Sequence, residues 1–402
     1  MQFAGWLVVI LVASLLPSQA PAADIPTERD VTFFVMSDPH IGFQDKNQPT
    51  RSTDEIIGDG RRQVERIAGI IGTPYPDRSP LASLKPGNVA TPRALLIAGD
   101  LTDNQRWDAF TAVFPPAGIR TATGSIPILL CVGNHDGDPG GPVRRGAVDS
   151  NRAHQRAGRL AAISEDGMHY AVNWDGLHVL CLGLCPADTV DADLPFKYGK
   201  PGPGSWNDPK QALAFLKKYL REHIGTSGQP VVLMHHYGFD GFSTNDWYWW
   251  TPQQRRAYYD ALAGYNVVAI LHGHDHHAAH YRWPNPEASV EEARRQFGDN
   301  PPPDPRTYDV FSCGSLCWVF RVTGDRFVAA HYGGHGTGWD TELVMVKPLT
   351  SREISVNDGR PSCTPQKSTA AKLQPCSSPV KTEREPDREL LPQIDCCCLC
   401  ER

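Results

Sequence analysis

Residues 266–277 read NVVAILHGHDHH, an apolar and mostly β-branched run that ends abruptly in histidine and aspartate. Such a run is typical of a buried strand. Four further runs of this kind end in polar residues, namely VTFFVM before SDPH (37–40), ALLIA before GD (99–100), IPILLCV before GNHD (133–136) and VVLM before HH (235–236). The sequence therefore predicts five buried strands, each followed by side chains that can carry chemistry.

Helical patterns separate these predicted strands. Residues 54–71 and 253–263 have such patterns, and Asp208-Pro209 is a good start for a helix that carries Leu213, Leu216 and Leu220 on one face. This alternation predicts an α/β layered domain in which the loops at the carboxyl ends of the strands gather into one site.

Two tight turns interrupt the alternation and predict β-hairpins, one at Asp175-Gly176 and one at Thr323-Gly324-Asp325. We expect these hairpins to extend the sheet or to form a second sheet packed on the first. Stretches rich in Pro and Gly predict surface loops at 74–92, 138–150, 186–204 and 284–306.

Composition excludes several classes of protein. The chain has 402 residues, of which 40% are hydrophobic, so it holds enough apolar material for a large core and is not wholly disordered. Its net charge of −6 argues against a general nucleic-acid binder, which needs a basic face to meet phosphates.

The N-terminus predicts export. The apolar run at 5–17 is too short to span a bilayer comfortably, and small residues follow it, which indicates a signal peptide of residues 1–22 cleaved after Ala22. An uncleaved membrane anchor is the alternative. No other segment is apolar enough to cross a membrane, so we expect a periplasmic or secreted protein with no membrane span after cleavage.

The C-terminus differs in composition from the body of the chain. We expect one folded domain over 23–350, with further strands at 308–347, and a disordered tail over 351–402 that holds six of the eleven cysteines. The terminal CCCLC matches no zinc-site spacing. In the body, the pairs Cys181/Cys185 and Cys313/Cys317 would lie about 13 Å apart along a strand, so neither pair can form a disulfide.

The polar residues that follow the strands are metal-ligand types, namely carboxylate, imidazole and amide oxygen. Asp38 and His40 are two residues apart, and so are His274 and His276, so each pair projects to one side of its strand end. Any one such motif is more often an ordinary turn, and a lone His235 is more often a core histidine. Five motifs in one order indicate a common site.

That order, D-x-H, G-D, G-N-H-D, a histidine after a strand and G-H-x-H, resembles the calcineurin-like metallophosphoesterase superfamily over residues 31–278. The resemblance implies a two-sheet β-sandwich flanked by helices, a four-layer αββα fold, with two metal ions at the strand ends. It implies that Asp38, His40 and His276 hold one metal, that Asn134, His235 and His274 hold the other, and that Asp100 bridges both.

The same resemblance implies roles for two further residues. His135 would donate to the phosphate or protonate the leaving oxygen, and Asp103 would orient its imidazole. Purple acid phosphatases of this superfamily place an iron-ligating Tyr three residues after the bridging Asp, where this chain has Asp103. The departure points to Mn, Zn or Fe(II), among which the sequence does not choose.

Several neighbours leave more than one interpretation open. His236 and His277 each follow a predicted ligand. Three roles are open for each of them: to orient a ligand, to contact the substrate, or to lie in solvent. The aromatic run Trp247-Tyr248-Trp249-Trp250 is either a wall for an organic leaving group or ordinary packing. Five arginines either clamp an anionic substrate or lie on solvated surface, which is the default interpretation. They are Arg51, Arg61, Arg62, Arg144 and Arg145.

These features predict an exported, metal-dependent phosphoesterase that cleaves phosphate monoesters or diesters by attack of a hydroxide held between two divalent metal ions. The alternative is a catalytically silent metal-binding module on the same fold, which has no need of His135. A nuclease is disfavoured by the export signal and by the lack of a basic stripe. The sequence indicates no oligomeric state.

Overall fold

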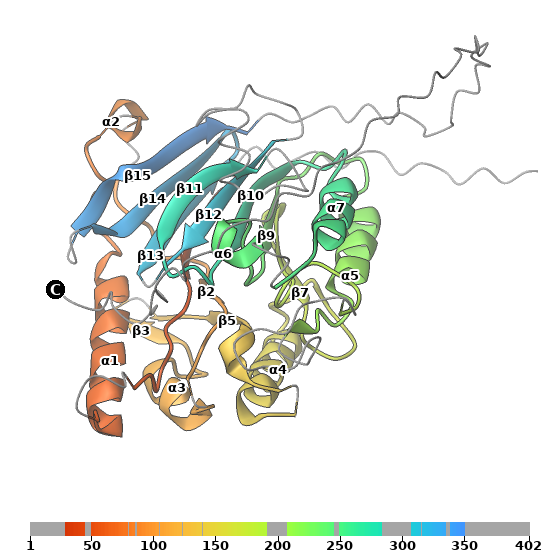
Figure 1. The fold of residues 1–402 in the computed structure, drawn as a ribbon. Coiled ribbons are helices and arrows are strands. Elements are labelled where there is room, and N and C mark those ends of the chain that lie inside the picture. The colour runs from red at the N-terminus through yellow and green to blue at the C-terminus, as the bar shows by residue number, and fades with distance from the viewer. Residues whose placement is uncertain are drawn as a thin grey trace, which may run out of the picture.

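Two β-sheets face each other in the computed structural model (Figure 1). In spatial order the first contains β15 (Gly338–Pro348), β14 (Arg326–Gly334), β13 (Cys317–Thr323), β1 (Asp30–Met36), β2 (Leu95–Ala98) and β5 (Ile128–Cys131). The second contains β11 (Ala278–Trp283), β12 (Tyr308–Cys313), β10 (Val267–His272), β9 (Val231–Met234), β8 (Leu177–Cys181), β7 (Tyr170–Trp174) and β6 (Ala162–Ile163). A separate hairpin pairs β3 (Ile119–Thr121) with β4 (Gly124–Ile126).

The structure describes residues 29–349 except 45–49, 79, 85–86, 104, 123, 139, 191–206, 245–248, 284–306, 315 and 335–337. The predicted signal peptide and tail, and most of the predicted loops at 186–204 and 284–306, lie outside the described residues. Among the described residues, no helix combines the length and the apolar character needed to cross a membrane.

Parallel pairing at the centre of each sheet brings strand ends together. In the first sheet β1 pairs parallel with β2 and β2 with β5, and in the second β8 pairs parallel with β9 and β9 with β10. The carboxyl ends of parallel strands meet at one edge of a sheet. The loops after β1, β2, β5, β9 and β10 are therefore neighbours.

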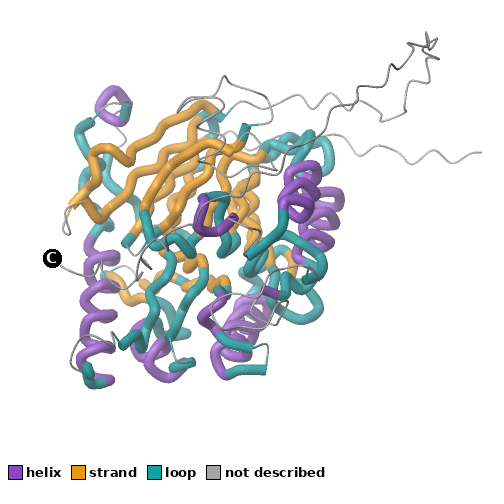
Figure 2. The backbone as a smooth tube through the Cα atoms, in the orientation of Figure 1, coloured by secondary structure: helices purple, strands orange, loops and turns teal. Residues whose placement is uncertain are grey.

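Helices cover the outer face of both sheets (Figure 2). The outer core of the first sheet includes side chains of α1 (Thr53–Gly69), α3 (Trp107–Val113) and α4 (Pro142–Arg156). That of the second includes side chains of α5 (Ala212–Tyr219), the π-helical turn Leu220–Ile224 and α7 (Pro252–Ala261). The short helices α2 (Leu81–Leu84) and α6 (Gly241–Thr244) and the 3₁₀ turn Asn134–Asp136 complete the described helices.

Strand alternation divides the side chains among three cores. On β1, Phe33 faces the core between the sheets, whereas Phe34 faces the outer core beneath the helices. Because both faces are covered, the central strands are apolar along their whole length, which explains the uninterrupted runs in the sequence.

The two-sheet sandwich with flanking helices is confirmed, and so are both hairpins. Each hairpin extends a different sheet, β7–β8 the second and β13–β14 the first. The predicted helices 54–71 and 253–263 match α1 and α7 closely. The five described cysteines are free and buried, as expected for pairs that cannot bridge themselves.

Two local predictions were wrong. Residues 138–150, predicted as a loop, contain the start of α4, because Gly141 and Pro142 form the N-terminus of a helix. The helix predicted from Asp208 begins at Ala212, because Asp208 instead accepts a hydrogen bond from the Lys210 N–H and because Lys210 and Gln211 both have positive φ.

The inter-sheet core contains an unusual histidine whose titration is testable. His331 on β14 is 6% exposed and packs 5.3 Å from the Trp318 ring, and neither ring nitrogen has a hydrogen-bond partner among the described residues. Burial lowers the pKa of His331 from 6.5 to about 4. Because the unfolded chain binds this proton more readily, stability falls as pH drops from about 6.5 to about 4, by roughly 3 kcal/mol in full.

His331→Phe is expected to keep the packing and to remove this part of the pH dependence. The thermal midpoints of the wild type and the variant should differ more at pH 5 than at pH 7.5, in favour of the variant. A midpoint difference that is the same at both pH values would contradict the assignment.

Candidate dinuclear metal centre

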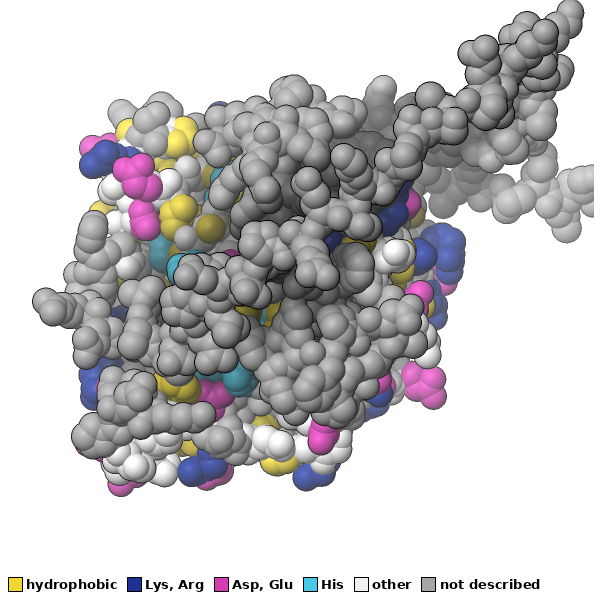
Figure 3. Space-filling view, in the orientation of Figure 1, with side chains coloured by type: hydrophobic (Ala, Val, Ile, Leu, Met, Phe, Trp, Pro, Cys, Tyr) yellow, Lys and Arg dark blue, Asp and Glu magenta, His cyan; other side chains and the backbone are white. Residues whose placement is uncertain are grey.

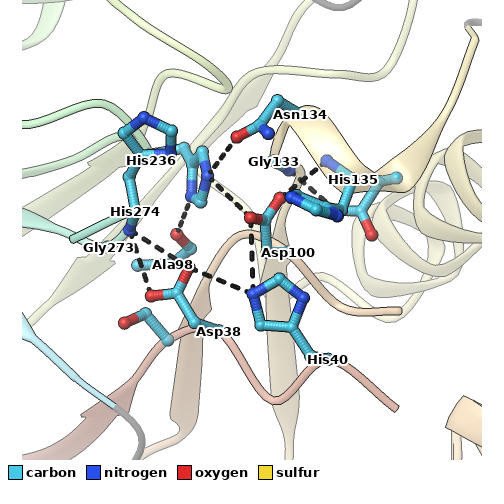
Figure 4. Close-up of polar contacts among 12 residues, drawn as sticks. Asp38, His40, Ala98, Asp100, Gly133, Asn134, His135, His236, Gly273 and His274 are labelled. Atoms are coloured by element: carbon cyan, nitrogen blue, oxygen red, sulfur yellow. Dashed lines mark hydrogen bonds and ion pairs between the residues drawn. The ribbon is translucent and has the colours of Figure 1, made fainter. Parts of the chain in front are cut away.

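Loops from both sheets converge on one cluster of polar side chains (Figure 4). Asp38 and His40 follow β1, Asp100 follows β2, and Asn134 and His135 follow β5, all from the first sheet. The second sheet contributes residues that follow β9 and β10, namely His236, His274 and His276. In the space-filling view, histidine side chains reach the surface beside hydrophobic and acidic ones (Figure 3).

The backbone of these loops is strained where the predicted ligands lie. Nine described non-glycine residues have positive φ, and five of them are the predicted ligands Asp38, His40, Asp100, His274 and His276. A left-handed backbone at a non-glycine residue costs free energy and persists only where its surroundings enforce it. The loops are thus held so that their side chains point into a common space.

Two glycines make room for the cluster. Gly99 has φ +98°, and a Cβ there would overlap the imidazole of His236. A Cβ on Gly133 would overlap the side chain of Asp100. These glycines allow the loops after β2 and β5 to approach closely enough for the polar side chains to meet.

One group of ligand atoms comprises Asp38, His40, Asp100 and His276. The Nε2 atoms of His40 and His276 lie 3.0 Å apart. Oδ1 of Asp38 lies 3.8 Å from Nε2 of His276 and 4.0 Å from Nε2 of His40. The backbone N–H of His274 donates to the Asp38 carboxylate at 3.1 Å, which fixes its orientation.

A second group comprises Asp100, His236 and His274, with Asn134 beside it. Nδ1 of His236 donates to the carbonyl oxygen of Ala98 at 2.9 Å, so Nε2 faces Oδ1 of Asn134 at 3.0 Å and Oδ2 of Asp100 at 3.3 Å. Both oxygens are acceptors. The space between these three atoms therefore requires a proton on Nε2 or a cation.

Asp100 belongs to both groups. Its Oδ1 accepts the backbone N–H of His135 at 2.9 Å, and its Oδ2 lies 3.6 Å from Nε2 of His40 in addition to the contact with His236. Burial raises the pKa of Asp100, but the charge and hydrogen bond of His236, together with the charges of His135 and His40, outweigh burial and hold the pKa well below its ordinary value. Burial lowers the pKa of His236, but the charge and hydrogen bond of Asp100, together with the charge of Asp38 and the hydrogen bond to Ala98, outweigh burial and raise the pKa to about 9. An ionised carboxylate is thus held between the two groups.

The donor set fits two divalent cations. Carboxylate, imidazole and amide oxygen suit Mn, Zn and Fe(II). Nε2 of His274 is buried and lacks a hydrogen-bond partner among the described residues. Burial also lowers the pKa of this imidazole and so keeps it neutral. A neutral, unpartnered imidazole nitrogen is what a metal ligand needs, because a histidine must be unprotonated to bind a metal ion.

The structure does not bring His235 into this cluster, contrary to the prediction. Nδ1 of His235 donates to the carbonyl oxygen of Tyr237 at 2.7 Å, and its ring packs among Phe239, Trp250 and Tyr258 on the helix side of the second sheet. Successive residues of a strand point to opposite faces of the sheet. Met234 points between the sheets, and His236, two residues later, points to the same side. Both faces of that strand are apolar, so the sequence held no signal that distinguishes His236 from His235.

Asp103 connects His135 to the cluster. Its Oδ1 lies 2.8 Å from Nδ1 of His135 and 3.4 Å from Nδ1 of His40. Burial lowers the pKa of His135, but the hydrogen bond with Asp103 and the charges of Asp100 and Asp103 together outweigh burial and raise the pKa above its ordinary value. The His135 side chain is about half exposed (48%), so a protonated imidazole is available beside the cluster.

Arg144 and Asp136 support the loop after β5, and neither role was predicted. The carboxylate of Asp136 accepts the N–H of Gly133 at 2.7 Å and that of Thr102 at 3.1 Å. Arg144 is 1% exposed and donates from Nη2 to the carbonyl oxygen of Gly133 at 3.4 Å. The default interpretation as solvated surface is therefore wrong for Arg144, and it holds for Arg61, Arg62 and Arg145.

The described residues of the aromatic run, Trp249 and Trp250, are both buried in the outer core of the second sheet. Trp250 is fully buried, and the Trp249 ring packs edge-on 4.4 Å from the ring of His274. Trp247 and Tyr248 lie outside the described residues. His277 is exposed and donates from Nδ1 to the carbonyl oxygen of Asp275, so it orients no ligand directly.

The sequence model described as calcineurin-like phosphoesterase matches residues 31–278, and the chain belongs to that family. It is a metal-dependent phosphoesterase, a hydrolase that acts on phosphoric esters. Membership implies divalent metal ions at the cluster and phosphate esters as substrates.

Similar solved structures include a dimetal phosphatase from Danio rerio, with 12% identity, a TM-score of 0.46 and coverage of 80% of this chain and 99% of that one. A purple acid phosphatase from yellow lupin seeds has 14% identity, a TM-score of 0.44 and coverage of 79% and 54%. The structure of PhoD has 12% identity, a TM-score of 0.42 and coverage of 83% and 72%. No curated protein matches this chain in sequence.

Adjacent histidines provide a matched test of the cluster. Asn retains a donor near the position of Nδ1 and deletes Nε2, so His236→Asn should lose one of the two metal equivalents because a ligand nitrogen is removed. His235→Asn should retain both. Metal-to-protein ratios after dialysis against Mn²⁺, with circular dichroism to verify folding, measure this. Loss of metal from the His235 variant alone would contradict the placement.

Proposed function

We propose that the chain is an exported phosphoesterase that cleaves phosphate mono- or diesters at this cluster. Asp38, His40 and His276 hold one divalent cation, and a second is held by Asn134, His236 and His274. The observation that carries the proposal is the position of Asp100, whose buried carboxylate belongs to both groups of ligand atoms and would therefore serve as a ligand to both cations.

When bound, two such cations supply positive charge that draws the phosphate of an ester into place and activates water as a nucleophile. The chain's own contribution is orientation. The strained loops, the glycine clearances and the hydrogen bonds to Asp38 and Asp100 hold the ligands before any cation arrives. Such preorganisation avoids a reorganisation cost during the reaction.

His135 provides the proton for the leaving oxygen. Its Nδ1 is occupied by Asp103, so Nε2 is the atom that can donate toward a bound ester. Asp103 favours the protonated imidazole and fixes the ring orientation, in the manner of a carboxylate–histidine pair. Asp103 therefore positions His135 rather than touching the substrate.

Substitutions separate the role of the cluster from that of the acid. Asp100→Asn should lose metal and most activity, because one carboxylate serves both cations. His135→Ala should keep its metal and lose rate by roughly 10²–10⁴-fold, because a general acid is removed. The exposed His223, which lies outside the cluster, gives the control variant His223→Ala. Hydrolysis of p-nitrophenyl phosphate and bis-p-nitrophenyl phosphate with Mn²⁺ or Zn²⁺, together with metal analysis, measures both quantities.

Two outcomes would contradict this proposal. Equal metal loss in the Asp100 and His135 variants would remove the division of roles. A wild-type chain that binds metal yet hydrolyses neither ester would favour the catalytically silent metal-binding module. Relative rates on the two esters also distinguish a monoesterase from a diesterase.

Export rests on the apolar segment at 5–17 and the small residues that follow it. Expressed in a secreting bacterial host, the mature protein should begin at Ala23, as intact mass and N-terminal sequencing would reveal. Leu11→Arg should block cleavage, because a charge interrupts the apolar run. A full-length chain retained in the membrane fraction would instead favour the uncleaved anchor.

A further inference from the structure

Phe242 is an exposed aromatic side chain beside the metal cluster. It is 42% exposed, and only one other large hydrophobic side chain among the described residues, Phe43, is as open. Phe242 belongs to α6, which follows the β9 loop that carries His236 (Figure 1). An exposed phenyl ring contributes little to the core, and its position beside the cluster makes it available to a ligand.

The ring of Phe242 lies against a predicted metal ligand. Its centroid is 4.8 Å from that of the His274 imidazole, with 33° between the planes, and 6.1 Å from the ring of Trp249. Trp249 and Tyr237 pack edge-on against the same imidazole at 4.4 and 4.9 Å. Both are buried, at 5% and 0% exposed. They already shield His274, which leaves the exposed part of Phe242 free for a ligand.

The charge around α6 narrows the kind of group that would bind. Asp240 lies two residues before Phe242, and its carboxylate accepts the N–H of Ser243 at 2.8 Å and the hydroxyl of Ser243 at 2.7 Å. This negative charge disfavours a second anionic group on the same side. An uncharged aromatic ring, in contrast, stacks on phenylalanine through dispersion and its quadrupole.

We propose that Phe242, backed by Trp249, is a platform for an aromatic ring in the organic part of the phosphate ester, a proposal that rests on the proposed function of the cluster. The phosphate lies at the cations, and the ring of its alcohol or phenol lies on Phe242. The platform therefore selects aryl and other ring-bearing phosphate esters over small alkyl esters.

Non-hydrolysable phosphonates test the platform by binding. On the Mn²⁺-loaded full chain, calorimetry should show phenylphosphonate binding more tightly than methylphosphonate. Phe242→Ala should weaken phenylphosphonate about tenfold and leave methylphosphonate within about twofold, because one ring-stacking contact is lost. Phe242→Tyr keeps a ring and should restore the preference, whereas Phe242→Leu keeps only apolar surface and should not.

Four outcomes would overturn the platform. Equal weakening of both phosphonates in Phe242→Ala, with loss of metal, would mean that Phe242 only supports His274. An unchanged phenylphosphonate affinity would mean that the ring binds elsewhere. A wild type that binds methylphosphonate and hydrolyses esters without favouring the phenyl compound would overturn the platform alone. A metal-loaded wild type that binds neither phosphonate and cleaves no ester would overturn the proposed function together with it.

Discussion

Asp100 is 1% exposed, and imidazole nitrogens from both sheets point at its Oδ2 atom. An ionised carboxylate removed from water requires compensating positive charge, because an unpaired buried charge is costly. In the protein alone that charge comes from protonated imidazoles. At His236, the charge of Asp100 and the other contacts that favour protonation outweigh the effect of burial and raise the pKa to about 9. Divalent cations meet the same requirement and release those protons. The buried carboxylate thus explains why divalent cations would bind at this position.

The rest of the fold serves this convergence. Parallel pairing brings the carboxyl ends of the central strands to one edge, and the sandwich brings the edges of two sheets together. Glycines at 99 and 133 allow the close approach, and the left-handed backbone at five predicted ligands turns their side chains inward. Strain of this kind is stable only because three buried cores hold the loops from beneath.

Much of this arrangement could be predicted from the sequence, because strand ends in parallel sheets are neighbours whatever the details of the loops. The choice between His235 and His236 could not be made from VVLM, since both faces of that strand are apolar and hydrophobicity does not reveal which residues face inward. The start of α4 was obscured for a different reason. Gly141 and Pro142 favour a helix N-terminus as well as a loop, and the buried Arg144 lies on that helix.

Anomalous diffraction from crystals of the Mn²⁺-loaded chain, collected at the manganese absorption edge, tests the central claim most directly. We expect two peaks, one on each side of the Asp100 carboxylate, with His236 rather than His235 contacting one of them. A single peak, or peaks that do not share Asp100, would contradict it.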